Sequence, residues 1–463
     1  MPDSSAAAGL RRCALFATIA QLLLVGVGLR HNLVWGESER WPWLLTLLNV
    51  GEAAGLAAFV VLAGLAFVRA LRLVRTGPVP PATLWRLTLP IVGAAVLVPL
   101  FASTDAVDYV MRGRIQALHG ANPYVHVATG FAGDPFLGFG DAGWKGFPLP
   151  YGPIVANLQA GIAWLAHLLP VEPRAELIAA LLLCKLLFAS ALLAVAVVLR
   201  RLSVRLHGGD GNVAFVAVAW NPLLLFEGVA NAHNEPLVLL CVAVAVAVGE
   251  RASRGAFALG LGVLVKVVPV VLVPAWVAAA ARQRQLRALL VGTAAVAAVA
   301  AVFWWQFFRE PGAFGVLARQ GELRGGSLLW ALHQLTGVGM PALVVAGRSV
   351  VAVGALLAAV HVGRRGSERE LVAATAATMA LLAVLGSALF GPWYHVWWVP
   401  FALLLGQGFL FRAALLASVT SPLAYLVWAG MRRLDEPSQW CTVVAAVVVP
   451  FAGALVWRPR AVT

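Results

Sequence analysis

The sequence contains few charged residues for its length. Asp, Glu, Lys and Arg make up 12% of the 463 residues, whereas soluble domains carry about 25%. Hydrophobic residues make up 61%, and the mean hydropathy is +0.87. A soluble core does not need so many apolar side chains. The composition therefore excludes an ordinary soluble domain and predicts an integral membrane protein.

Cysteine is also scarce. Cys13, Cys184, Cys241 and Cys441 are far apart and mostly lie within apolar runs. Their spacing matches neither a disulfide framework nor a metal site, so we interpret them as small buried hydrophobic residues. No other group of residues has a strong metal-ligand spacing. We therefore expect no cofactor, although the sequence does not exclude a divalent metal.

Acidic residues are outnumbered, with 20 Asp and Glu against 34 Lys and Arg, which gives a net charge of +14. Such an excess can indicate nucleic-acid binding. The arginines, however, stand in short clusters at the ends of apolar runs, as in the cytoplasmic loops of membrane proteins. We therefore expect membrane lipids and no nucleic acid as partners.

Apolar runs near the ~20 residues of a membrane-spanning helix recur along the whole chain. They predict an all-α fold, a polytopic transmembrane helical bundle of about 13 spans that forms one integral membrane domain over residues 1–463. The candidate runs are 10–29, 43–68, 84–101, 175–199, 213–226, 237–248, 289–308, 342–361, 371–390, 396–411, 413–429 and 440–457.

The arginine clusters predict the orientation of these spans. If the clusters face the cytoplasm, both termini are cytoplasmic, the protein lies in the cell inner (plasma) membrane, and the loops 104–170 and 309–340 are extracytoplasmic. Residues 153–170 resemble a span, but a crossing there would place Arg200 outside. We therefore expect surface helices in the 104–170 loop after the third span.

The segment 256–281 has arginines at both ends, so it must enter the membrane and return. Pro269 and Pro274 stand where such a segment needs a break. We expect a broken or re-entrant pair of short helices with Lys266 near the turn. Broken helices are tolerated in membranes where they line a cavity in the protein.

The first expected outer loop carries two candidate catalytic carboxylates. Asp105 and Asp108 are three residues apart, which places them on one face of a helix. Asp105 directly follows the third span and should lie at the outer membrane boundary. The residues Ser103-Thr104-Asp105 also resemble a helix N-cap, so either carboxylate can instead serve as a cap.

Two further polar clusters stand in expected outer loops. Asn221 to Glu227 with Asn231 to Glu235 can hold a metal, orient a sugar or form a satisfied turn. The segment 392–398, which contains His395, can form an interfacial aromatic belt or stack on a sugar. His395 is polar and can act as an acid, a base or a hydrogen-bond donor to a phosphate.

Two cations inside apolar runs are candidates for binding a phosphate. Lys266 and Arg348 are costly to bury in lipid, so each should face the protein interior or a cavity. A cation in the outer half of the membrane suits the phosphate of a lipid.

At these residues the sequence resembles the bacterial GT-C glycosyltransferases that use polyprenyl-phosphate sugars, especially the polyprenol-phosphate-mannose-dependent α-mannosyltransferases of glycosyltransferase family 87. The similarity runs in order from Asp105 to Pro400. It rests on five segments: Asp105-x-x-x-Tyr109 with Gly113-Arg114 and Gly120-x-Asn122-Pro123-Tyr124; Tyr151-Gly152-Pro153; Trp220-Asn221-Pro222 to Ala232-His233-Asn234-Glu235; Lys266-x-x-Pro269 with Pro274; and Pro392-x-Tyr394-x-x-Trp397-x-x-Pro400. The chain departs from the relatives in carrying Glu235 where they often have Asp, and in its acidic Asp108.

This resemblance implies a hexosyltransferase that moves a sugar, mannose above all, from a polyprenyl-phosphate donor to a lipid-linked or glycan acceptor on the outer face, with inversion. It implies three groups of site residues. The catalytic candidates are Asp105 and Asp108. The donor phosphate candidates are Lys266, Arg348 and His395. The sugar and acceptor candidates are Tyr109, Arg114, Asn122, Tyr124, Tyr151, His233, Asn234, Glu235, Tyr394 and Trp397.

Two other functional classes compete with this reading. A multi-pass transporter or flippase of a lipid-linked sugar also has many spans and intramembrane charges. It would carry internal repeats, which are not visible in this sequence, and few large outer loops. A membrane scaffold would leave the acidic outer loop and Lys266 without a role. The sequence therefore favours the enzyme.

Overall fold

A computed structural model describes residues 4–34, 42–100, 102–140, 142–310, 312, 323–427 and 436–457. Across these residues the regular secondary structure consists of helices, with isolated bridges between Gly325–Gly326 and Leu389 and no named strand. The predicted all-α fold is confirmed. The orientation predicted from the arginine clusters also places residues 35–40 in an outer loop, and they lie outside the described residues.

Seven helical segments among the described residues are long and apolar enough to cross a membrane. An eighth span would combine the helix pair Asn212–Ala219 and Pro222–Ala230, which is bent by 44° at its break. The predicted polytopic membrane fold is thereby confirmed. The count of about 13 spans stays a prediction, because α3 (Pro81–Leu97), α10 (Glu235–Ala247) and α11 (Ala252–Val265) are shorter. The seven segments are Ala7–Leu29 in α1 (Ser4–Val34), Val50–Thr76 in α2 (Pro42–Thr76), α7 (Pro173–His207), α13 (Leu286–Trp304), α16 (Met340–Arg365), Phe409–Val427 and Glu436–Val456.

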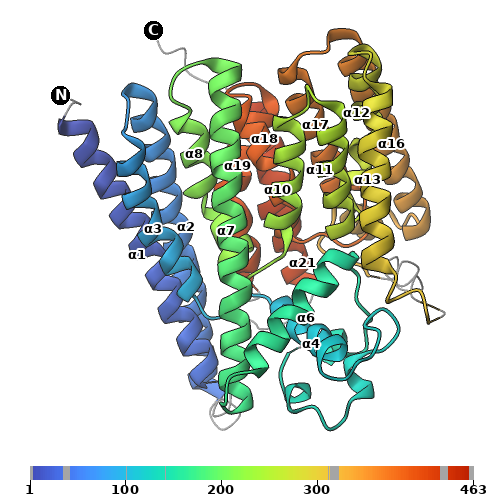
Figure 1. The fold of residues 1–463 in the computed structure, drawn as a ribbon. Coiled ribbons are helices and arrows are strands. Elements are labelled where there is room, and N and C mark those ends of the chain that lie inside the picture. The colour runs from blue at the N-terminus through green and yellow to red at the C-terminus, as the bar shows by residue number, and fades with distance from the viewer. Residues whose placement is uncertain are drawn as a thin grey trace.

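The two ends of the helical bundle differ in character (Figure 1). One end, called the loop end, carries α4 (Asp105–Ala117) and α6 (Pro153–His167). Helix α1 begins at the opposite, arginine end. There Arg205 pairs with Glu368 and donates to the Ala247 carbonyl at 2.7 Å, and Arg282 donates to the Gly363 carbonyl. Arginine clusters that are far apart in sequence thus contact neighbouring helices at one end.

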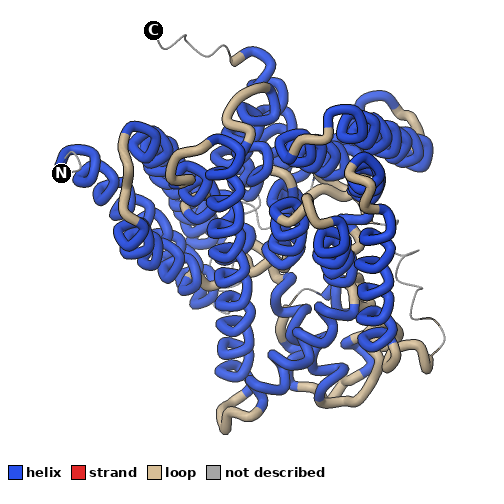
Figure 2. The backbone as a smooth tube through the Cα atoms, turned by 45° about the horizontal axis from the view of Figure 1, so that its top comes forward, coloured by secondary structure: helices blue, strands red, loops and turns tan. Residues whose placement is uncertain are grey.

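The loop end consists of helices α4 and α6 packed against each other beside the start of α7 (Figure 2). Helix α6 has 15 residues, which is about 22 Å of helix and short of the ~30 Å hydrocarbon core. The two helices approach closely at Gly113, where a Cβ atom would lie 2.1 Å from the Gln159 carbonyl oxygen. A short α-helix, α5 (Ala142–Lys145), and the 3₁₀ turns η2 (Ala128–Gly130) and η3 (Pro135–Gly138) complete the loop.

The segment 256–281 contains a break. Helix α11 ends at Val265, Lys266 is extended with φ −157° and ψ 138°, and the chain resumes as η5 (Val268–Leu272) and α12 (Val273–Arg282). Pro269 and Pro274 stand in the first turns of η5 and α12, where a missing N–H costs nothing. The break leaves Lys266 between two short helices.

The segment 309–340 is described only in part, because residues 311 and 313–322 lie outside the described residues. Its second half forms α15 (Leu328–Thr336), which Ser327 caps by accepting a hydrogen bond from the Trp330 N–H at 3.0 Å. The chain then continues into α16.

Candidate active site

Asp105 stands at the first position of α4 with a partly exposed carboxylate. The preceding Thr104 makes no side-chain cap, while Ser103 Oγ accepts a hydrogen bond from the Asp105 N–H at 3.2 Å. The Asp105 side chain is 21% exposed, and its Oδ2 lies 3.8 Å from His233 Nε2. The carboxylate therefore reaches water on one side and an imidazole on the other.

His233 is delivered by a bent segment that the sequence encodes at Asn221-Pro222. Asn221 Oδ1 accepts hydrogen bonds from the N–H groups of Leu223 and Leu224, which starts a new helical turn after the break. One turn of π-helix (Phe226–Ala230) follows, a form that often marks functional sites. Ala232 then adopts a left-handed φ of 54°, and the buried His233 ring stacks on Trp393 at 4.5 Å.

Glu227 contacts the other side of the His233 ring. Its Oε2 lies 3.1 Å from His233 Nδ1 and accepts hydrogen bonds from Tyr425 Oη and Asn231 Nδ2. Burial lowers the pKa of His233, but the hydrogen bond and charge of Glu227 and the charge of Asp105 outweigh it, so the pKa of His233 is raised. The imidazole thus lies between two carboxylates.

Lys266 forms the cationic part of the cluster. Its Nζ donates a 2.6 Å hydrogen bond to Oε1 of the buried Glu235. The ammonium also lies 5.2 Å from the Tyr151 ring, 5.4 Å from Trp397 and 5.9 Å from Tyr394, within the range of cation–π attraction. The Lys266 side chain is 16% exposed. The result is a cation surrounded by aromatic rings.

A pair of tyrosines connects Asp105 with the Lys266–Glu235 pair. The hydroxyls of Tyr109 and Tyr151 are 3.4 Å apart, and their rings meet edge to face at 5.5 Å. Burial raises the pKa of each phenol well above its usual value, and the charges of Asp105 and Glu235 raise it further. Both tyrosines therefore stay protonated hydrogen-bond donors near both carboxylates.

Several buried polar atoms of this cluster find no hydrogen-bond partner among the described residues. They include Nδ2 and Oδ1 of Asn234, Oε2 of Glu235, Nη2 of Arg112 and Nε1 of Trp397. Buried polar groups are nearly always hydrogen-bonded. A ligand rich in hydroxyl groups would satisfy both the donors and the acceptors of this set.

The chain matches a family model over residues 14–282, more than half of its length. The model describes the N-terminal domain of the alpha-(1->6)-mannopyranosyltransferases, the MptA/B family. The chain belongs to this family. The family name indicates mannosyltransferase activity and agrees with the GT-C mannosyltransferase resemblance of the sequence. No curated relative matches the chain.

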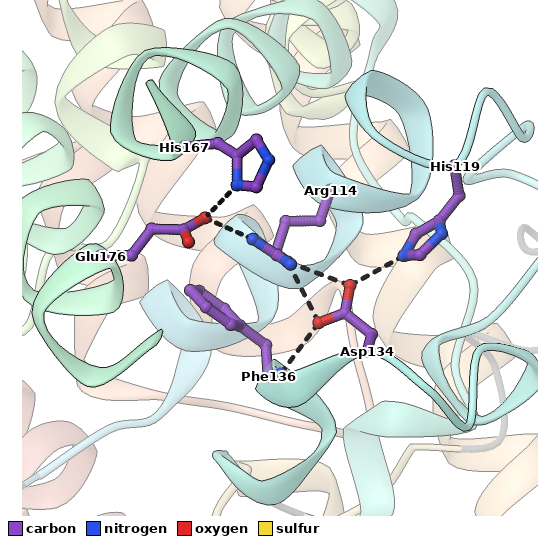
Figure 3. Close-up of polar contacts among 6 residues, drawn as sticks. All are labelled: Arg114, His119, Asp134, Phe136, His167 and Glu176. Carbon is purple, nitrogen blue, oxygen red and sulfur yellow. Dashed lines mark hydrogen bonds and ion pairs between the residues drawn. The ribbon is translucent and has the colours of Figure 1, made fainter. Parts of the chain in front are cut away.

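Arg114 does not reach the cluster in this member of the mannosyltransferase family. Its guanidinium bonds both oxygens of Asp134, at 3.0 and 3.1 Å, and pairs with Glu176 (Figure 3). It also lies 3.9 Å over the Phe136 ring. Arg114 is buried and joins α4 to the loop and to α7. Its Nε and Nη1 groups donate to these two carboxylates, and a contact between Arg114 and the sugar stays a prediction.

Asn122 and Tyr124 also have partners of their own. Asn122 Nδ2 donates to the Phe307 carbonyl at 3.1 Å, and its Oδ1 accepts from the Tyr124 N–H. Tyr124 Oη donates to the Tyr151 carbonyl at 2.8 Å, and its ring packs on Trp304 and Phe307. Both residues hold the loop against the end of α13, and their expected contact with the sugar stays a prediction. Tyr124 supports the backbone of Tyr151.

His395 and Arg348 have hydrogen-bond partners of their own. His395 is fully buried, its Nε2 donates to the Ala446 carbonyl, and its Nδ1 accepts from Trp398 Nε1 at 2.8 Å. Burial lowers the pKa of His395 to about 4, so the ring is neutral. Arg348 is exposed on α16 and donates to the Gly386 carbonyl. That these two residues bind the donor phosphate stays a prediction.

Asp108 differs from Asp105 in its surroundings. It is 3% exposed, and its Oδ1 lies towards Gly140 of the loop, 3.7 Å from where a Cβ of that glycine would stand. Asp105 is thus the more accessible of the two candidate catalytic carboxylates.

Four residues near Asp105 were not among the site residues that the resemblance implies. Ser103, Glu227, Trp393 and Tyr425 all contact Asp105, His233 or each other. Their sequence signals were general: Ser103 stands in a possible helix N-cap, Glu227 in the polar cluster from Asn221 to Glu227, and Trp393 in the aromatic segment 392–398. Within the described ranges no three His, Cys, Asp or Glu side chains gather as they would around a metal ion.

Proposed function

We propose that the chain is an inverting mannosyltransferase that moves mannose from a polyprenyl phosphate to a lipid-linked or glycan acceptor on the outer face of the plasma membrane. One observation carries this proposal. A partly exposed carboxylate, Asp105, lies in the same polar cluster as Lys266, a cation surrounded by aromatic rings. The transfer of a sugar from a phosphate to a hydroxyl group, with inversion, needs two groups: a base for the hydroxyl proton and a cation for the phosphate that leaves.

The proposed reaction is a single displacement. The acceptor hydroxyl oxygen attacks the anomeric carbon of the mannose, the bond from that carbon to the phosphate oxygen breaks, and its electron pair stays on the lipid phosphate. Asp105 takes the hydroxyl proton, and Lys266 stabilises the growing charge on the phosphate. No second carboxylate nucleophile takes part, so the anomeric centre inverts.

The environment of Lys266 supports this role. Glu235 accepts one hydrogen bond from the ammonium at 2.6 Å, and the ammonium has further N–H donors that can reach a phosphate oxygen. The rings of Tyr151, Tyr394 and Trp397 offer faces for a sugar. The orphan atoms of Asn234 and Glu235 suit sugar hydroxyl groups.

The proposed orientation rests on the arginine clusters that gather at the end opposite α4 and α6. Excess arginine faces the cytoplasm in membrane proteins, which would put Asp105 outside and both termini inside. Because nucleotide sugars are cytoplasmic, an outward-facing enzyme needs a donor delivered on a lipid. Cysteine substitutions at His126 and Arg364, probed with a membrane-impermeant thiol reagent in a chain without its natural cysteines, test this orientation.

The test of the activity uses membranes that contain the full chain and radiolabelled polyprenyl-phosphate mannose. We expect label to appear in a lipid or glycan acceptor, and we expect Asp105→Asn to abolish most of it. Glu310→Gln is the matched control, because Glu310 is an exposed carboxylate paired with His126 elsewhere at the loop end. Full transfer by Asp105→Asn, or movement of the donor across the bilayer without a new bond, would refute the proposal.

A further inference from the structure

Three side chains form a continuous path from the buried core to Asp105. Glu227 is fully buried, and its Oε2 lies 3.1 Å from His233 Nδ1. On the other side of the ring, His233 Nε2 lies 3.1 Å from Ser103 Oγ and 3.8 Å from Asp105 Oδ2. Ser103 Oγ in turn accepts a hydrogen bond from the Asp105 N–H. Each end of the imidazole is therefore tied to a different carboxylate.

The contacts of His233 determine which of its nitrogens carries a permanent proton. Nδ1 faces two acceptors, the Glu227 carbonyl oxygen and the Glu227 carboxylate, both at 3.1 Å. Nδ1 must therefore donate. The nitrogen that gains or loses a proton is Nε2, which faces Ser103 and Asp105. A change at Glu227 is thus felt at Asp105 through the ring.

The charges around His233 favour the protonated, positively charged form of its ring. Carboxylates face it from three elements: Asp105 at the start of α4, Glu227 in the π-helical turn and Glu235 at the start of α10. The Glu235 charge is shared with Lys266. The remaining neighbours are the uncharged ring of Trp393 and the phenol of Tyr425, which contacts Glu227. Two negative charges contact the ring directly.

We propose that Glu227 is a positioning residue for the transfer reaction, holding His233 as a cation that fixes the orientation of Asp105 beside the acceptor. This inference rests on the proposed function. Glu227 itself touches no substrate, because its side chain has no exposed surface. It acts as the third group that orients the partner of a catalytic residue.

The surroundings of Glu227 indicate more than filling of the core. A buried carboxylate is costly unless it is paired, and an apolar residue would pack among Phe226 and Val229 at no such cost. The chain instead supplies Tyr425, Asn231 and His233 to a single oxygen of Glu227. The left-handed φ of Ala232 adds backbone strain at the turn that presents His233, and such strain is typical of functional sites.

The test compares Glu227→Gln with the wild type in the transfer assay between pH 6 and 9. In the wild type, kcat falls as the pH rises through the raised pKa of His233, because Nε2 then loses its proton. Glu227→Gln keeps the shape but removes one charge, so we expect this fall to begin about one pH unit lower. We also expect kcat to drop at least tenfold with KM unchanged.

Two further variants make the result decisive. His233→Gln removes the titrating group, so its kcat should be low and independent of pH over this range. Glu370→Gln is the control, since Glu370 pairs with His361 at 2.5 Å near the arginine end, and its pH profile should match the wild type. If the fall of kcat stays at the same pH in Glu227→Gln, or persists in His233→Gln, the proposal is overturned.

A readout without substrate separates this inference from the proposed function. A histidine whose pKa is raised by folding stabilises the fold fully at pH values below its pKa in the unfolded chain, about 6.5. This stabilisation is lost as the pH rises through the pKa of the histidine in the folded chain. The Tm of the purified wild type should therefore fall with rising pH, and in Glu227→Gln this fall should come earlier. If the wild type transfers no mannose from the polyprenyl donor but the Tm curves differ as expected, the donor assignment fails and the link from Glu227 to His233 stands. Identical Tm curves refute the link.

Discussion

Lys266 Nζ donates a 2.6 Å hydrogen bond to Glu235 Oε1, and this pair joins the break after α11 to the start of α10. Glu235 is 1% exposed while Lys266 is 16% exposed. The carboxylate is therefore buried behind the lysine, and the ammonium is the member of the pair that a ligand can reach. The pair serves both the fold and the proposed chemistry, and the two contributions can be separated by mutation.

We predict that Lys266→Met lowers both stability and transfer, whereas the double variant Lys266→Met with Glu235→Gln recovers stability alone. The single change leaves a buried carboxylate without its cation, which costs on the order of 3 kcal/mol. The double change removes the unpaired charge but restores no cation for the phosphate. Thermal unfolding in detergent and the mannose transfer assay measure the two effects. Recovery of transfer in the double variant would contradict a phosphate role for Lys266.

Gly152 brings Tyr151 up to Lys266. Its N–H donates to the Val265 carbonyl at 2.9 Å, and a Cβ atom there would lie 2.1 Å from the Leu264 carbonyl oxygen. We predict that Gly152→Ala costs about 1–3 kcal/mol of stability and lowers transfer, because the loop must move away from α11. Gly161→Ala on α6 is the control, since nothing lies within 4 Å of its Cβ position. Equal Tm values for both variants would contradict this packing.

The sequence was sufficient to predict the fold class and several members of the cluster. The apolar runs predicted an all-α polytopic protein, and a helix of at least 19 residues needs no long-range information to be recognised. The proline pair after Lys266 predicted the break, because proline acts locally on the backbone. Lys266 was singled out because a charge inside an apolar run is costly, and Asp105, His233 and Glu235 because they are polar residues in expected outer loops. Their assigned roles remain predictions.

Two of the residues predicted to contact the sugar, Arg114 and Asn122, have partners far away along the chain. Arg114 pairs with Asp134 and Glu176, 20 and 62 positions later, and Asn122 bonds the Phe307 carbonyl 185 positions later. No local pattern separates such a structural arginine or asparagine from one that binds a sugar. Glu227 was named only as part of a polar cluster, because its partners His233 and Tyr425 meet it only in the folded chain.

We predict that Arg114→Met lowers stability without changing how the remaining active protein binds its donor. The change leaves Asp134 and Glu176 buried without their cation, at a cost of about 3 kcal/mol or more. Since Arg114 does not reach the Lys266 cluster, KM for the donor should stay near the wild-type value while Tm falls. Thermal unfolding and initial rates over a donor series provide the two measurements. A raised KM at unchanged Tm would return Arg114 to the site.

Replacing Asp105 or Asp108 with asparagine should have different effects on kcat and on Tm. We predict that Asp105→Asn lowers kcat by about 10²–10⁴-fold, the usual contribution of a general base, with little change in Tm because its carboxylate is partly exposed. Asp108→Asn changes a buried group, so we expect a lower Tm and a smaller loss of kcat. Steady-state rates and thermal unfolding of the two variants decide between them. If Asp108→Asn had the larger effect on kcat, the base would be Asp108.

The final prediction concerns acid and the loop around Asp134. Burial raises the pKa of Asp134, but hydrogen bonds from His119, the Phe136 N–H and Arg114 outweigh it, so the pKa is lowered (Figure 3). A carboxyl group whose pKa is lowered by folding stabilises the fold fully at pH values above its pKa in the unfolded chain, about 3.9. This stabilisation disappears as the pH falls through the pKa of the group in the folded chain. Pepsin should therefore cleave residues 118–140 much faster at pH 3 than at pH 5, beyond the change in its own activity on an unfolded peptide. Asp134→Asn cannot titrate, so its loop should be cleaved at similar corrected rates at both pH values. Equal corrected rates for the wild type at pH 3 and pH 5 would show that Asp134 does not hold the loop.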